Sequence, residues 1–173
     1  MMASNGSSSR SSSGVIAECV LSTIWKLGAR ATDQDTRTRL LRSLLRRFPY
    51  WSHGHHLLAE DSLARDNVGC AYASALCMQA LGFRSKHEQT CAEFILGRCF
   101  LRRGDWREAL KYLGAASDSA PNNPRIKEER AAALILGGEM KAAQEILAAI
   151  PKHLISAEGK AALAFTSSKL GSS

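Results

Sequence analysis

One stretch in the middle of the chain decides the fold, and it runs from residue 96 to residue 121 as LGRCFLRRGDWREALKYLGAASDSAP. Its apolar residues recur at helical spacing on both sides of a short Gly-Asp turn. The positions that carry the pattern are Leu96, Gly97, Phe100, Gly104, Asp105, Trp106, Ala109, Leu113, Ala116 and Pro121. Two helical segments joined by so short a connection are expected to lie antiparallel and side by side.

The same spacing returns elsewhere in the chain. Moving 34 residues on from Ala109 reaches Ala143, and the companions arrive in step as Ala131, Leu134, Gly138, Leu147 and Ile150. Moving 38 residues back reaches Ala71, with Leu58, Ala59, Val68, Ala75 and Met78 at the matching offsets. The four additional residues fit in the loop from Phe83 to Glu88, where an insertion is tolerated. Internal repetition of this period predicts a stack of helical hairpins.

The pattern resembles the tetratricopeptide repeat, whose period is about 34 residues and which combines a Leu-Gly pair, aromatic residues, an alanine and a proline. The resemblance covers about residues 51–150 well and the flanks poorly, and only the unit from Gly97 to Pro121 is specific by itself. It implies an all-α fold, a right-handed superhelical solenoid of antiparallel helix hairpins.

Residue size supports this interpretation independently. Two antiparallel helices approach closely only where the side chains between them are small, so small residues on first helices should face alanines on second helices. These facing residues are Ala59, Gly97 and Ala131 on one side and Ala71, Ala109 and Ala143 on the other. Larger residues fill the space between hairpins, and we expect them to be Leu58, Leu96, Phe100, Trp106, Leu113, Leu134 and Leu147. A single hairpin would leave these residues in water, so the hairpins must stack.

The rest of the chain fits one helical domain between two polar tails. Four prolines and abundant Ala and Leu favour helix after residue 14. We predict a disordered Ser-rich tail over residues 1–14, a helical domain over 15–168 and a second disordered tail over 169–173. The domain is predicted to hold a degenerate hairpin at 15–49, repeats at about 51–84, 90–123 and 124–150, and a closing helix at 152–168.

Charge and cysteine content indicate an intracellular protein. The formal net charge is +7 with a pI near 9.4, and the excess is local, because residues 1–50 hold eight Lys or Arg against Glu18, Asp33 and Asp35. Five cysteines, an odd number, lie inside helical patterns and do not resemble a disulfide framework. No apolar run is long enough to cross a bilayer, so we expect no membrane span. The expected compartment is the cytoplasm, and an organelle transit peptide in the Ser-rich start is the alternative.

No set of residues predicts catalysis, a metal site or a cofactor. His53, His55 and His56 precede several cysteines, but structural zinc sites use close ligand pairs, whereas Cys70 and Cys77 lie two helical turns apart. Nothing marks a Cys-His hydrolase, and Gly137-Gly138 lacks the sequence of a phosphate loop. We therefore expect a protein that is not an enzyme.

A basic amphipathic helix is predicted at residues 36–48. Arg39, Arg42 and Arg46 share one face, and leucines with Phe48 cover the other. Arginine binds carboxylates and phosphates in a planar bidentate manner, so this face could bind an acidic helix or phosphates. The simpler interpretation is a solvated outer face.

The resemblance also implies where a partner binds, because first helices of successive tetratricopeptide repeats line a concave groove that takes a peptide or helix. On this chain the groove residues would be His56, Glu60, Phe94, Arg98, Arg102, Arg125 and Glu128. Their mixed but basic character implies a peptide segment of acidic or mixed charge. A subgroup of the family clamps the carboxylate of a chaperone tail, but His56, Glu60, Ile95 and Glu129 replace the residues that such a clamp uses.

Three functions follow from these patterns. The leading hypothesis is a protein–protein interaction adaptor or scaffold that holds a partner in the groove. The second is a basic-surface binder of RNA or phosphate-bearing partners, which the few aromatic residues disfavour. The third is a noncatalytic repeat subunit of a larger transferase assembly. The sequence identifies neither the partner nor the oligomeric state.

Overall fold

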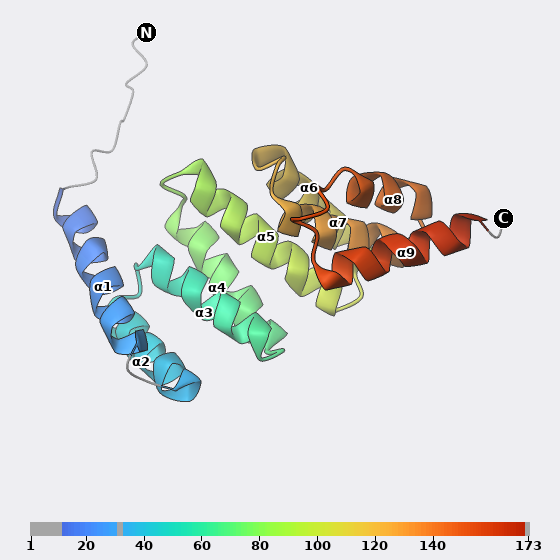
Figure 1. Cartoon of the computed structure of the whole chain (residues 1–173). Coiled ribbons are helices and arrows are strands. Elements are labelled where there is room, and N and C mark those ends of the chain that lie inside the picture. Colours follow the sequence, from blue (N-terminus) through green and yellow to red (C-terminus); the bar gives the residue numbers. More distant parts are fainter. Residues whose placement is uncertain (1–11, 31–32, 172–173) are drawn as a thin grey trace, which may run out of the picture.

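The computed structural model describes residues 12–30 and 33–171, so most of the first predicted tail lies outside the described residues. Within these ranges all regular secondary structure is helical, which confirms the predicted all-α class. The helices are α1 (Ser12–Arg30), α2 (Gln34–Arg47), α3 (Ser52–Ala64), α4 (Val68–Leu81), α5 (Lys86–Arg102), α6 (Trp106–Ser119), α7 (Pro124–Leu136), α8 (Met140–Ala148) and α9 (Ala157–Gly171). They follow one another along an elongated array from α1 to α9 (Figure 1).

Local capping explains where the helices begin. The side chains of Asn67, Asp105 and Asn123 accept hydrogen bonds from backbone N–H groups in the first turns of α4, α6 and α7. These bonds satisfy donors that have no partner within a helix. Gly104 and Gly138 follow α5 and α7 with φ of +78° and +84°, a left-handed conformation that favours glycine. The turns within the hairpins are therefore encoded locally.

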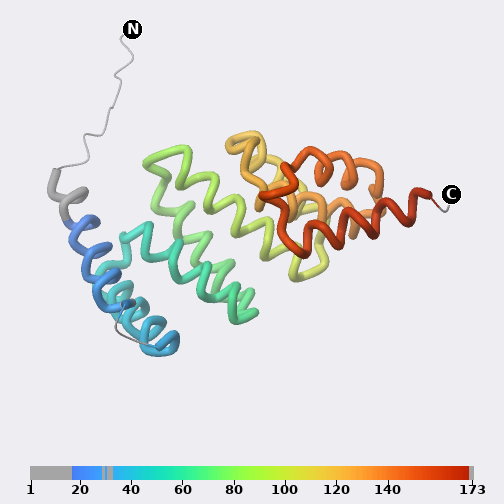
Figure 2. The backbone as a smooth tube through the Cα atoms, viewed as in Figure 1, coloured from blue at the N-terminus to red at the C-terminus, as the bar shows by residue number. Residues whose placement is uncertain are grey.

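The helices form two layers, with the odd-numbered helices in one and the even-numbered helices in the other. Consecutive helices pack together, and α1–α3, α3–α5, α5–α7 and α7–α9 are also in contact. Among the described residues no two even-numbered helices touch in this way. The odd-numbered layer is therefore the inner one, and the backbone path in Figure 2 follows this alternation along the chain. The structure is a tetratricopeptide-like solenoid.

The crossing points inside each hairpin use the predicted small residues. Ala59, Ala71, Ala109, Ala131 and Ala143 are all fully buried. In the α5–α6 hairpin, a Cβ atom added to residue 97 would lie 2.5 Å from Cγ of Leu113 and 3.3 Å from its backbone nitrogen. Glycine at position 97 is thus required by the close approach of the two helices.

Apolar clusters lie along the solenoid and join successive hairpins. One cluster unites Leu63 of α3 and Met78 of α4 with Leu96 of α5, and the next unites Leu113 of α6 with Ile126 of α7. Similar clusters tie α1 and α2 to α3 and tie α7 and α8 to the start of α9. Each hairpin thus buries its large residues against a neighbour, as a stacked repeat requires.

Helix boundaries differ from the prediction at several points. The insertion expected at the loop before α5 is partly taken up by α5 itself, which begins at Lys86. The closing helix begins at Ala157 rather than 152, because the backbone N–H groups of Leu154 and Ile155 both donate to the carbonyl of Pro151 and form a turn. Helical residues also extend into both predicted tails, at 12–14 and 169–171.

Candidate protein-binding surface on α3, α5 and α7

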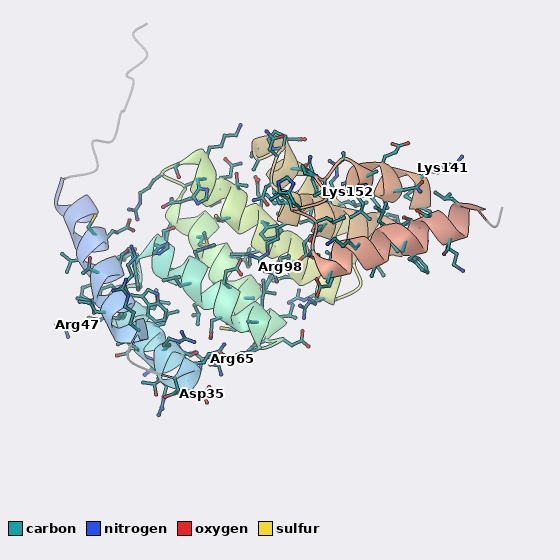
Figure 3. The ribbon with its side chains drawn as sticks, in the orientation of Figure 1. Asp35, Arg47, Arg65, Arg98, Lys141 and Lys152 are labelled. Carbon is teal, nitrogen blue, oxygen red and sulfur yellow. The ribbon has the colours of Figure 1, made fainter. Side chains whose placement is uncertain are left out.

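Charged residues from three inner-layer helices meet around Arg98 of α5. Its guanidinium lies 3.3 Å from a carboxylate oxygen of Glu60 on α3 and 3.0 Å from one of Glu129 on α7. Arg125 of α7 lies 3.4 Å from the same oxygen of Glu60. Figure 3 shows Arg98 in the middle of the molecule, at this junction of repeats. We call Glu60, Phe94, Arg98, Arg125 and Glu129 the α3–α5–α7 surface.

Phe94 lies beneath the two arginines of this surface. The guanidinium carbons of Arg98 and Arg125 lie 5.5 Å and 5.3 Å from the ring centroid, within the range of a cation–π interaction. The Phe94 residue is only 8% exposed and packs in the apolar cluster with Leu113 and Ile126. The Phe94 ring therefore contacts both guanidinium groups, and these groups shield the ring from water.

Exposure separates the two arginines. The side chain of Arg98 is 12% exposed and that of Arg125 is 55% exposed. Arg98 has its charge balanced by two carboxylates, whereas Arg125 shares one carboxylate and faces water. Since a partner can contact only what it can reach, Arg125 is the accessible cation of this surface and Arg98 holds the carboxylates in place.

His56 lies one helical turn before Glu60 on α3 and is half-buried. Burial lowers its pKa below the ordinary value of 6.5, against the opposing effect of Glu60. Its Nδ1 atom is buried without a hydrogen-bond partner among the described residues, and its ring stacks on that of His53 at 6.0 Å between centroids. His56 thus extends the α3–α5–α7 surface toward the start of α3.

Arg102 and Glu128 lie outside the charge network. Arg102 pairs with Asp66 in the α3–α4 turn at 2.6 Å, and both side chains are exposed. Glu128 accepts a hydrogen bond of 2.6 Å from the backbone nitrogen of Ser156, just before α9. The structure therefore brings Glu60, Phe94 and Arg125 together around Arg98, whereas Arg102 and Glu128 bind residues outside this network.

One acidic residue of the charge network, Glu129, was not among the predicted groove residues. It completes the bridge to α7, and the comparison with the chaperone-tail clamp had already placed it at a position that such a clamp uses. Glu93, the residue before Phe94 on α5, is buried, and one of its carboxylate oxygens accepts a hydrogen bond of 2.8 Å from Gln89. Its other oxygen has no partner among the described residues. The Glu60–Arg98 pair spans 38 residues, the same offset that relates their two repeats.

The predicted basic residues lie on α2, away from the α3–α5–α7 surface. Arg39 and Arg42 line a hollow of about 430 Å³ together with Asp35, Thr38 and Arg65. Arg65 is bound to Asp35 and Asp61, so it is not a free cation. Figure 3 shows Asp35 and Arg65 together at this end of the molecule. Arg46 does not line the hollow.

Cys91 and Cys99 are poorly suited to act as nucleophiles. Cys91 lies 3.7 Å from Nε2 of His87, but burial raises the pKa of its thiol. Burial raises the pKa of Cys99 to about 11. Both shifts favour the thiol over the nucleophilic thiolate. Within the described part of the chain, no three His, Cys, Asp or Glu residues converge as metal ligands, and no helix has the length and apolar character to cross a membrane.

Comparison with known proteins supports the family. A tetratricopeptide repeat family model matches residues 100–164, from the end of α5 into α9. The match confirms the suspected resemblance and extends it past residue 150. A comparison with curated proteins gives no significant match.

Proposed function

We propose that this chain, which carries tetratricopeptide repeats, is a protein-interaction adaptor that holds a segment of a partner protein against the α3–α5–α7 surface. Repeats of this family mediate protein–protein interaction. The observation that carries the proposal is the Arg98 network, in which side chains from three repeats are fixed relative to one another before any partner arrives. A preorganised surface loses less conformational entropy on binding.

The charge pattern supports a partner segment of acidic or mixed charge. Arg125 and Arg102 present accessible guanidinium groups at two places along the inner layer, each facing only one carboxylate. A carboxylate from a partner would compete with Glu60 for Arg125 or with Asp66 for Arg102. Arg98 acts as a positioning residue, because Glu60 and Glu129 already bind its guanidinium group.

Because Arg98 is a positioning residue, the proposal is tested by substituting the exposed arginines and not Arg98. Exchanging Arg98 for Glu would set three carboxylates against one another and could unfold the junction, so loss of binding would have two explanations. Exchanging the exposed pair instead, in the double variant Arg102→Glu/Arg125→Glu, should leave the fold intact. The matched control is Arg107→Glu/Lys111→Glu on α6, which removes two exposed cations from the outer layer.

The experiment is affinity capture from the native cell extract with quantitative mass spectrometry. It compares the wild type, the double variant Arg102→Glu/Arg125→Glu (the groove variant), the outer-layer control, and Arg39→Glu/Arg42→Glu/Arg46→Glu (the α2 variant). The expected result is a protein partner that the wild type, the control and the α2 variant retain and the groove variant loses. Equal retention by the groove variant, or loss confined to the α2 variant, would contradict the proposal. Nuclease treatment that releases the captured material would support the RNA-binding alternative instead.

A noncatalytic role fits the surroundings of the same surface. Its charged groups are paired with one another, and the nearby Cys91 is held as a thiol. A free adaptor and a noncatalytic subunit of a larger enzyme retain different proteins in the capture experiment, which therefore distinguishes the two.

A further inference from the structure

The outer side of α1 exposes a stripe of aliphatic residues at one end of the solenoid. Val20, Ile24 and Leu27 are 51%, 44% and 63% exposed. Their spacing of four and three residues is that of a seam between two packed helices. Isolated apolar residues on a surface are normal, but a row of three on one face marks an interface.

The inner side of α1 already has its partner. Leu21 is buried with Leu41 and Trp51, and Trp25 packs against the same cluster. Glu18 is bound to Arg84, which ties α1 to the loop before α5. The helix is therefore fixed in the solenoid, and the stripe points to the place where a preceding hairpin would stack. A solenoid end that needs no partner carries a polar outer face.

The charges of the first hairpin that have no ion-pair partner among the described residues are all positive. The cations of the first hairpin are Lys26, Arg30, Arg37, Arg39, Arg42, Arg46 and Arg47, and none forms an ion pair within the part of the chain that the structure describes. Its three carboxylates are committed elsewhere. Glu18 binds Arg84 and Asp35 binds Arg65, while Asp33 caps α2, which lowers its pKa to about 2.

Some of these cations lie beside the stripe. Arg30, three residues after Leu27 on α1, is exposed and lies to one side of the stripe. Lys26 is exposed too, but it lies on the flank of α1 near His53 of α3, whose pKa it helps to lower. Arg47 points outward at the same end of the molecule in Figure 3. The stripe is thus an apolar seam with a basic margin.

We propose that a helix of a partner protein, with a complementary aliphatic stripe and acidic flanks, stacks on α1 in the place of a further repeat. The aliphatic residues close the seam, and the acidic flanks pair with Arg30 and Arg47. This interface is separate from the α3–α5–α7 surface, so it does not depend on the function proposed for that surface.

Other occupants fit less well. A second copy stacked α1 on α1 would oppose the cations of both copies, and α9 offers it Lys160 and Lys169 against Glu158 alone. Residues 1–11 of the chain supply no acidic residue. An RNA would use the cations but leave the stripe in water, and membrane-surface helices favour exposed Trp or Phe, whereas Trp25 is engaged in the core.

The test uses a stapled synthetic helix with leucines at the seam spacing and glutamates on both flanks, and a matched helix with lysines on the flanks. Binding is followed by fluorescence anisotropy at low and high salt. The stripe variant is Ile24→Ser/Leu27→Ser and the charge variant is Arg30→Glu/Arg47→Glu. The control is Leu136→Ser/Lys141→Glu, since Leu136 is similarly exposed on α7 and Lys141 on α8.

The glutamate-flanked helix should bind wild type and the control alike, and each of the two test variants should weaken it at least about tenfold. Melting temperatures should stay unchanged, because all substituted side chains are exposed. Failure of this helix to bind, equal binding of the lysine-flanked helix, or undiminished binding to the stripe variant overturns the proposal. So does tighter binding of anionic vesicles or single-stranded RNA through the same residues, or wild-type self-association in sedimentation that the stripe variant abolishes.

Discussion

Arg98 lies between two carboxylates from different repeats, and this environment decides what its side chain can do. An arginine that is 12% exposed and bound to Glu60 and Glu129 stabilises the stacking of three helices. Arg102, one turn further along α5, faces a single exposed carboxylate and contributes little to stability. Two residues with the same chemistry and the same helix therefore have different roles, because one is covered by neighbouring repeats.

Gly97 provides a prediction at the same scale. Gly97→Ala should lower the free energy of unfolding by about 1–3 kcal/mol, because the added Cβ would collide with Leu113 and with the α6 backbone behind it. Urea denaturation followed by circular dichroism measures the change. Ala109→Leu, at the other side of this crossing, should be destabilising for the same reason.

Gly114 is the matched control for Gly97. It lies within α6, and a Cβ added there would meet no atom within 4 Å. Gly114→Ala should therefore raise stability by about 0.5–1 kcal/mol through its better helix propensity. If both alanine variants changed stability equally, the close approach at Gly97 would not be the cause.

His56 gives the protein a pH dependence of predictable sign. Burial lowers its pKa in the folded state, so between that pKa and the ordinary value of 6.5 the unfolded chain binds a proton that the folded chain does not. Stability should be complete above 6.5 and fall as the pH drops through this window. His53 shifts in the same direction, also chiefly through burial.

The check compares wild type with His56→Gln in urea denaturation at about pH 7.5 and about pH 5.5. The wild type should lose more stability than the variant between the two conditions, with His53 supplying part of the remaining loss. A variant that kept the whole pH dependence would show that His56 is not responsible.

At the scale of elements, α9 depends on a residue of α7. Glu128 accepts a hydrogen bond from the backbone nitrogen of Ser156, and the Ser156 hydroxyl accepts one of 2.9 Å from the backbone nitrogen of Gly159 in the first turn of α9. A Cβ atom added at residue 159 would lie 2.6 Å from a carboxylate oxygen of Glu128. Glycine at position 159 therefore permits the close approach of Glu128 to the first turn of α9. The start of the last helix is thus set by contacts across two repeats.

Glu128→Ala should consequently loosen α9 more than any other helix. The loss of a hydrogen bond to a charged acceptor costs about 1.5–3 kcal/mol. Hydrogen exchange should rise first in the backbone amides of α9, while α3 to α6 keep their protection. Glu158→Ala, an exposed carboxylate within α9 itself, is the control, and an equal effect from it would mean that the bond to Ser156 is unimportant.

At the scale of the whole molecule, each hairpin is supported by its neighbours in sequence. Among the described helices, α5 packs against α3, α4, α6 and α7, whereas α1 packs against α2 and α3 alone and α9 against α7 and α8 alone. Linear arrays of this kind have stabilities that follow nearest-neighbour contacts. The middle of the chain should therefore be its most stable part.

Native-state hydrogen exchange tests this gradient directly. The amides of α4 to α6 should exchange most slowly and those of α1, α2 and α9 most quickly, because the end helices lose fewer contacts when they open. Binding of a helix to α1 should raise protection in α1 and α2. Uniform protection along the chain would indicate a single cooperative unit instead.

The sequence by itself determined the hairpins and their crossings. Local capping residues, left-handed glycines and the spacing of Ala59, Gly97 and Ala109 act between residues that are close in sequence or related by the repeat period. That is why the class, the stacked hairpins and the buried alanines could be predicted from sequence alone. The seven groove residues were predicted from the family resemblance. The resemblance indicates which face of a helix they lie on, but not how exposed each side chain is.

The tertiary structure alone decided which charges remain available. The pairing of Arg98 with Glu60 and Glu129, the burial of Phe94 and the turning of Glu128 toward α9 depend on how far each hairpin is shifted along its neighbour. The exposed stripe on α1 likewise exists only because no further hairpin covers it within the described residues. Burial and ion pairing between repeats are properties of the stack, so no single helix sequence contains them.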